Sequence, residues 1–159
     1  MFCMMKKLLY LVFLLPLMLS CGVGDDDGER LGDYIVGTWL RGWEEGDVII
    51  EGSPLDEDGN PIWTPNRFTD SKYCFNDDGG YNGMVRSGSF YSIDIDGDTI
   101  YTGSFRCDNN NLQLNFMQQG RQQQILAQVE SFSKTMMTIR YHHVAEQLDI
   151  TVIMRLRKE

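Results

Sequence analysis

The stretch 88-GSFYSIDIDGDTIY-101 shows how this chain folds. Two runs of alternating apolar and polar residues flank Asp96-Gly97. Successive side chains of a strand point to opposite faces, so the first run predicts a strand whose buried face carries Tyr91, Ile93 and Ile95. Asp96-Gly97 predicts a type I′ hairpin turn, because both central positions of that turn need a positive φ. The stretch therefore predicts an antiparallel hairpin.

The same alternation continues toward the C-terminus, in the sets Leu112/Leu114/Phe116, Met137/Ile139/Tyr141 and Leu148/Ile150/Val152/Met154/Leu156. Turn signals recur at roughly nine to thirteen residues, which is typical of an all-β sandwich or barrel. We expect strands near residues 37–50, 68–76, 81–86, 89–95, 98–107, 112–118, 122–130, 135–143 and 147–157, and one turn of helix within 29–35. The predicted fold is all-β, an antiparallel up-and-down β-barrel of eight to nine strands, whose interior is nearly filled by side chains or holds one small ligand.

The first 20 residues have the layout of a secretory signal. Lys6 and Lys7 precede an apolar run from Leu8 to Leu19. That run is shorter than the roughly 20 residues that a membrane-spanning helix needs, although an N-terminal membrane anchor remains the alternative.

Met18-Leu19-Ser20-Cys21 resembles a bacterial lipobox, in which the cysteine is lipidated and becomes the mature N-terminus. The resemblance implies a bacterial cell-envelope protein, an outer-membrane lipoprotein held in the membrane by lipid on Cys21, and each buried methylene contributes about 0.8 kcal/mol. The alternative is a secreted protein with an incidental cysteine. Residues 21–30 form an acidic tether, in which Asp25 to Asp27 resemble a surface-export signal or only keep the linker solvated.

Composition limits the remaining chain to one domain, expected over residues 31–159. The 159 residues carry a formal net charge of −9, and loss of residues 1–20 removes two lysines and no acid. With this negative net charge, nucleic acid is not an expected partner, because phosphate binding requires a basic face. Cys74 and Cys107 suggest a disulfide, because the expected compartment is oxidising. The expected meander places them at opposite barrel ends, so separate thiols are favoured.

Gly37-Thr38-Trp39, which opens the first strand, looks like the Gly-x-Trp of lipocalins. The stretches 73-YCFNDDGGYNG-83, 88-GSFYSIDIDGDTIY-101 and 110-NNLQLNF-116 are similar to the lipocalin-like domains of small bacterial lipoproteins, and the likeness covers roughly residues 31–158. By this resemblance Trp39 plugs the closed barrel end, and Arg155 or Arg157 of the last strand packs across it. The Thr-Asp-Tyr motif of better-known lipocalins has no good match, so the resemblance supports fold more than function.

No motif selects a catalytic or metal centre, so neither an enzyme activity nor a cofactor is expected. Asp94, Asp96 and Asp98 surround Gly97, but a calcium loop needs its glycine sixth and a glutamate twelfth, and this pattern is better read as a solvated turn. His142 and His143 are strand neighbours and point to opposite faces.

The loop 52–66 is longer than the hairpin turns, and loops above about 12 residues are usually functional or disordered. Trp63 either folds over the barrel mouth as a lid or packs on its rim. The candidate ligand or lid residues are Trp43, Ile62, Trp63, Tyr81, Tyr91, Phe116 and Tyr141. The favoured function is non-catalytic binding of a small apolar or amphipathic ligand. The alternatives are an interaction module that binds a glycan or envelope protein through this loop, and a structural envelope component.

Overall fold

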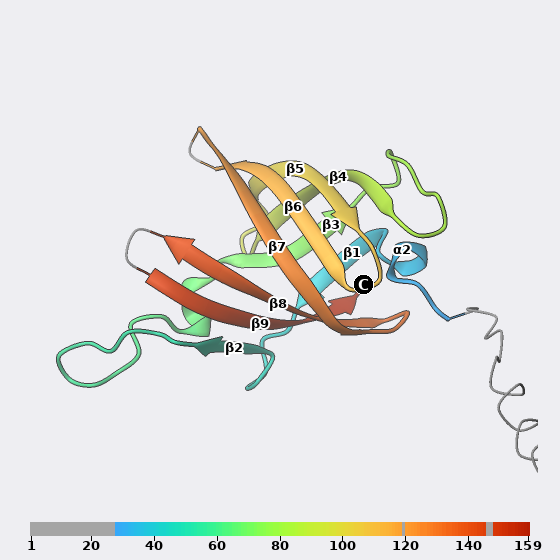
Figure 1. The fold of residues 1–159 in the computed structure, drawn as a ribbon. Helices are drawn as coiled ribbons and strands as arrows, with labels where there is room; N and C mark the ends of the chain where they lie inside the picture. The colour runs from blue at the N-terminus through green and yellow to red at the C-terminus, as the bar shows by residue number, and fades with distance from the viewer. Residues whose placement is uncertain (1–27, 119, 146–147) are drawn as a thin grey trace, which may run out of the picture.

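The chain folds into a closed antiparallel β-barrel of eight strands with one extra strand (Figure 1). The computed structural model describes residues 28–118, 120–145 and 148–159; the expected signal segment, Cys21 and most of the tether lie outside these residues. The all-β antiparallel class and the expected number of strands are confirmed. The elements are α2 (Leu31–Tyr34), β1 (Gly37–Arg41), β2 (Val48–Glu51), β3 (Asp70–Phe75), β4 (Arg86–Asp94), β5 (Thr99–Cys107), β6 (Asn111–Gln118), β7 (Arg121–Phe132), β8 (Met136–Ala145) and β9 (Leu148–Lys158), with a 3-10 turn over Pro65–Arg67.

The barrel closes through β1. Strands β3 to β9 pair in chain order, and β1 pairs with both β3 and β9, so that Trp39 lies between Tyr73 and Lys158. The extra strand β2 pairs with β9 farther along, where Val48 faces Met154. The expected strand over residues 37–50 is therefore wrong as one piece, because residues 42–47 leave the sheet between β1 and β2.

Asp47 explains this interruption. Its carboxylate is buried, accepts a hydrogen bond from the Glu44 amide at 3.1 Å and pairs with Arg155 at 3.2 Å. The Asp47 carbonyl also accepts a hydrogen bond from the Arg155 amide at 2.8 Å. A loop held at these points is fixed even though it lies outside the sheet.

The expected strand over residues 81–86 is wrong. Only one isolated bridge, between Tyr81 and Arg86, forms there, and the segment belongs to the connection from β3 to β4. The glycines and polar residues of this connection form local turns instead, as when the Asn82 side chain accepts a hydrogen bond from the Val85 amide at 2.8 Å.

The alternation predicted the buried faces of β6, β8 and β9 correctly, but not that of β4. The described members of the sets on β6, β8 and β9 are all buried. On β4 the inward residues are Phe90 and Ser92, whereas Tyr91 covers Cys74 from outside and Ile95 is 70% exposed in the following turn. Phe90 decides the face, because it packs against Phe75 and Phe116 with ring centroids 6.1 Å apart in each pair.

The turn after β4 also differs from the expected type I′ turn. The Gly97 amide donates to the Asp94 carbonyl at 3.3 Å, so the central residues are Ile95 and Asp96, and Gly97 follows them with a φ of +92°. The Asp94 side chain accepts hydrogen bonds from the Asp96 and Asp98 amides, at 2.9 Å each. The sequence places the hairpin correctly, but its loop is one residue longer, with glycine in the left-handed position.

Trp39 lies at the closed end of the barrel, fully buried against α2. Its indole nitrogen donates to the Ile35 carbonyl at 2.7 Å, and Leu31 and Ile35 are as completely buried. The cation across the ring is Lys158, 5.4 Å from the ring centroid, and not Arg155 or Arg157. Alternation along β9 explains this correction, because Lys158 shares the inward face of Leu156 while the two arginines point outward to Asp47.

Cys74 and Cys107 are both free and buried, so separate thiols are confirmed. The expected reason was wrong: without a strand at 81–86, the turns that follow these cysteines lie at the same barrel end. Register and facing keep the thiols apart. Cys74 lies under Tyr91 on the outer face, whereas Cys107 is part of the inner core and pairs with Arg86, five positions away along β4. Burial raises the pKa of the Cys107 thiol to about 11.

At the opposite end the barrel wall divides. The ladder between β7 and β8 ends at the pair Ala127–Tyr141, so residues 121–126 pair only with β6 and residues 142–145 only with β9. The two strands visibly diverge there (Figure 1). Within the described residues, no ladder joins β2 to β3 either. We call this end, toward which loop 52–69 extends, the barrel mouth.

Candidate ligand-binding site in the barrel mouth

Arg41 is a charged residue buried inside the barrel. It follows Trp39 by two positions on β1, so it shares the inward face and lies one layer nearer the mouth. Only 2% of its surface is exposed. Its guanidinium carbon stacks over the Trp43 ring at 3.8 Å from the centroid, and Trp43 itself is 56% exposed.

Three polar side chains from three other strands face Arg41, namely Asp70, Tyr101 and Tyr141, and Ser92 of β4 lies beside Tyr101. We call these five residues the Arg41 cluster. Nη1 of Arg41 lies 4.0 Å from Oδ1 of Asp70, which is too far for a hydrogen bond. Burial raises the pKa of Asp70, and the neighbouring Arg41 opposes that rise. Burial lowers the pKa of Arg41, and burial also raises the pKa values of Tyr101 and Tyr141, with Asp70 adding to both.

Among the residues that the structure describes, Nε and Nη1 of Arg41 have no hydrogen-bond partner, and both atoms are buried. The buried hydroxyl of Ser92 has only the neighbouring Tyr101 side chain to pair with there. A buried polar atom left unpaired costs about 1–3 kcal/mol, and more when it is charged. The cluster therefore presents hydrogen-bonding capacity that the protein itself does not use.

Apolar side chains border the cluster toward the mouth. Phe116 stacks on Tyr101 with ring centroids 4.5 Å apart. Trp63 of the long loop packs against Phe68 at 6.1 Å and against His143 of β8 at 5.6 Å. Charged and polar groups beneath an aromatic rim make an amphipathic environment.

The structure brings together some of the sequence-predicted residues and separates others. Phe116 and Tyr141 are buried inside the barrel, and Trp63 lies at the mouth, half-buried. Ile62 is beside Trp63 but 37% exposed. Two candidates lie elsewhere, since Tyr81 donates a 2.5 Å hydrogen bond to Asp33 of α2 at the closed end and Tyr91 is on the outer face. Neither belongs to the site at the mouth.

Sequence reasoning missed Arg41, Asp70, Ser92 and Tyr101. A usable signal existed for Arg41, because the spacing of two residues from Trp39 on one strand puts both on the same face. Phe90 gave a similar signal for Ser92, because the two residues are also two positions apart on one strand. Asp70 carries no such signal, since a register irregularity between Asp70 and Lys72 breaks the alternation.

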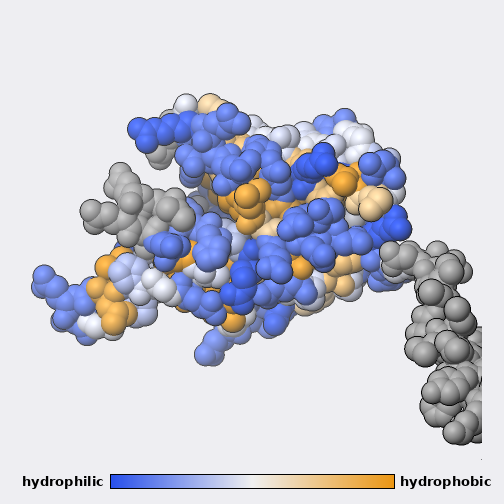
Figure 2. All heavy atoms as spheres, in the orientation of Figure 1, coloured by the Kyte–Doolittle hydropathy of each residue, from blue (hydrophilic) through white to orange (hydrophobic). Residues whose placement is uncertain are grey.

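The outer wall offers a second, weaker candidate. A hollow of about 280 Å³ lies over β5, β6 and β7, lined by Arg106, Gln113, Leu126 and Gln128 among others. Figure 2 shows apolar atoms exposed over β7, the strand that carries Leu126, which is 63% exposed. The polar groups that line this hollow are solvated rather than buried, so it lacks the unused hydrogen-bonding capacity of the Arg41 cluster.

The aspartates and histidines that the sequence offers as candidate metal ligands do not form a metal site among the described residues. Among the described residues, no group of three or more histidines, cysteines and carboxylates is arranged to hold a metal ion. His142 points outward, where its Nδ1 lies 3.3 Å from the Thr151 hydroxyl, and His143 packs inward against Trp63. The carboxylate of Asp94 is occupied by the amides of its own turn.

Comparisons with protein-family models, with curated proteins and with solved structures found no match. Over the part of the chain that the structure describes, there is no helix with the length and apolar character needed to cross a membrane.

Proposed function

We propose that this protein is a lipid-anchored envelope protein whose lipocalin-like barrel binds a small amphipathic molecule at its mouth without catalysis. The lipobox-like sequence around Cys21 supports the anchor. The observation that carries the binding function is the Arg41 cluster, where buried hydrogen-bonding atoms without partners lie beneath an aromatic rim.

The rest of the barrel supports a site at the mouth rather than a deep lumen. Below Arg41 the interior is filled by large side chains, among them Trp39, Phe75, Phe90 and Phe105. Toward the mouth, inward-facing side chains become half-buried or exposed, as at Tyr101, Ile125 and Gln123. This decrease in burial toward the mouth is consistent with a ligand of modest size bound between the Arg41 cluster and the rim.

Native mass spectrometry of the full chain, purified gently from its own host, tests the proposal. A reproducible added mass that is lost on denaturation is expected. A Tyr101→Ala variant, which removes a ring from the mouth, is expected to carry less of that mass, and a matched Tyr91→Ala variant on the outer face is expected to carry it unchanged. An unloaded wild type that also fails to bind amphiphiles in solution would overturn the proposal.

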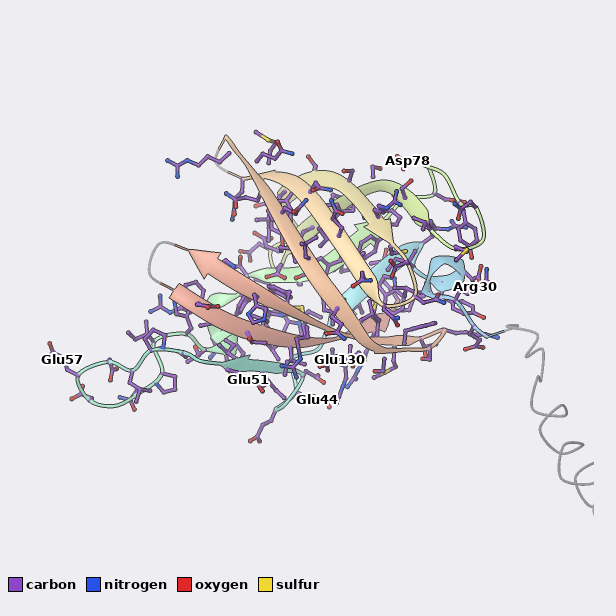
Figure 3. The ribbon with its side chains drawn as sticks, in the orientation of Figure 1. Arg30, Glu44, Glu51, Glu57, Asp78 and Glu130 are labelled. Atoms are coloured by element: carbon purple, nitrogen blue, oxygen red, sulfur yellow. The ribbon has the colours of Figure 1, made fainter. Side chains whose placement is uncertain are left out.

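The second candidate is an interaction module that binds a glycan or envelope protein through the long loop. The loop projects from the barrel, with Glu57 at its far end in Figure 3 and Arg30 and Asp78 at the opposite end of the molecule. Leu55 is 62% exposed on this loop, paired with Pro61 in an isolated bridge. A Leu55→Ser variant that loses a co-purifying envelope partner, while retaining any small ligand, would favour this function.

A further inference from the structure

We infer that the ligand carries an anionic head group, and that Arg41 binds it while its apolar part lies along the seam between β2 and β3. This inference rests on the proposed function and assigns the ligand class. Its basis is a buried permanent cation whose acidic neighbour, Asp70, is too distant to accept a hydrogen bond from it.

The charge of Arg41 determines which head group it can bind. A guanidinium stays protonated in proteins and offers five N–H donors and no acceptor. Asp70 is the facing carboxylate, at 4.0 Å, and the remaining cluster members are hydroxyl groups. No acceptor of the described residues lies within hydrogen-bond distance of Nε or Nη1, so these donors are left for acceptor atoms from outside the chain, and a carboxylate, phosphate or sulfate group supplies acceptors with complementary charge.

A ligand can reach Arg41 through the seam between β2 and β3. β1 leaves the sheet after Arg41, and within the described residues no interstrand ladder joins β2 to β3. The group that covers the guanidinium is the Trp43 ring, which belongs to the connection between β1 and β2 and is largely exposed. Because Trp43 lies outside the strands, its ring can rotate away from the guanidinium without breaking a hydrogen bond between strands.

The seam also provides the environment of the apolar part. Ile50 of β2, Trp63 and Phe68 are partly buried and pack on the core beside the β2–β3 seam. They come from the two segments that border the seam, β2 and the residues leading into β3. An aliphatic chain that extends from a head group at Arg41 toward the mouth meets these three side chains.

The overall charge of the protein bears on how a preference for anionic ligands would be interpreted. With a formal net charge of −9, the surface repels anions on average. Preference for an anionic amphiphile over a neutral or cationic one must then come from a local group.

Isothermal titration of the full chain with decanoate, 1-decanol and decyltrimethylammonium tests the inference, each below its aggregation concentration. Decanoate is expected to bind at least about tenfold more tightly than the other two, a difference of about 1.4 kcal/mol. Arg41→Met is expected to remove that preference through a loss of affinity for decanoate. Arg106→Met, which removes the same charge from the outer wall, is expected to keep it.

The outcomes separate the inference from the proposed function. If the three amphiphiles bind equally to the wild type, or if Arg41→Met keeps the preference for decanoate, the anionic site is wrong and the barrel still binds amphiphiles. If none of them binds, the proposed function fails as well. Should Arg41→Met not fold, the Nε–H resonance of Arg41 in the wild type decides, since it is expected to shift with decanoate and not with decanol.

Discussion

The strongest test of the buried cluster is a double-mutant cycle on Arg41 and Asp70. At 4.0 Å, two opposite charges attract by about 4 kcal/mol in an environment of effective dielectric constant near 20. Removing each charge from water costs several kcal/mol, so the pair as a whole contributes little net stability. Breaking it from one side is different where it leaves a carboxylate buried and alone.

The two single variants should not be equivalent. Burial raises the pKa of Asp70 even beside Arg41, so the folded state already favours the neutral acid, and we expect Asp70→Asn, which keeps its size without the charge, to lose less than about 1 kcal/mol of unfolding free energy. Arg41→Met removes the attraction that offsets the desolvation of the Asp70 carboxylate, so its loss should be larger, up to the roughly 4 kcal/mol of that attraction. The double variant Arg41→Met/Asp70→Asn should be within about 1 kcal/mol of the wild type.

Urea unfolding at neutral pH, with linear extrapolation to water, measures each free energy. A cycle on Lys72 and Glu159 is the control, since this pair is closer, at 3.1 Å, but its side chains are 38% and 54% exposed. That control should give a coupling energy below about 1 kcal/mol. Additive losses at Arg41 and Asp70 would refute the reasoning, because they would mean that the two buried charges do not interact.

Three further predictions concern acid titration, the closed end and the anchor. Burial raises the folded-state pKa of Asp70 above its ordinary value of 3.8, so its contribution to stability is complete below that value and is lost as the pH rises through the folded-state pKa. Urea unfolding across pH should therefore show a downward slope that Asp70→Asn removes, and an identical profile in the variant would contradict it. Trp39→Ala should lower the unfolding free energy by about 3–5 kcal/mol, while Trp43→Ala should change it little; a loss under about 1 kcal/mol at Trp39 would show that it does not plug the barrel. Cys21→Ser should abolish metabolic labelling with fatty acid and release the chain from the membrane, and persistent labelling would exclude the lipid anchor.

Much of the fold could be predicted from the sequence, because turn residues and period-two alternation are local signals. The alternation failed on β4, where apolar side chains occupy both faces. Tyr91 and Ile93 are large hydrophobic residues like Phe90, so the pattern alone could not select the buried face. Packing decided it, since Phe90 completes an aromatic cluster with residues of β3 and β6.

The candidate site was less predictable for a physical reason. A charged residue in a strand is normally assigned to the wet face, since burying a charge is costly. Arg41 breaks that rule, and only its spacing from Trp39 shows it. The meeting of Arg41 with Asp70 depends on β1 leaving the sheet and on the irregular start of β3, both of which are properties of the tertiary structure.

The division of the wall between β7 and β8 has a consequence for motion. Beyond the pair Ala127–Tyr141, and over the residues that the structure describes there, no ladder pair joins the facing edges of the two strands. The strands can therefore change their separation there while every ladder hydrogen bond in the barrel stays intact. Hydrogen exchange should be slow at the closed end, where β1 joins both its neighbours, and fast along these facing edges. The width of the mouth is then an adjustable dimension above a rigid floor.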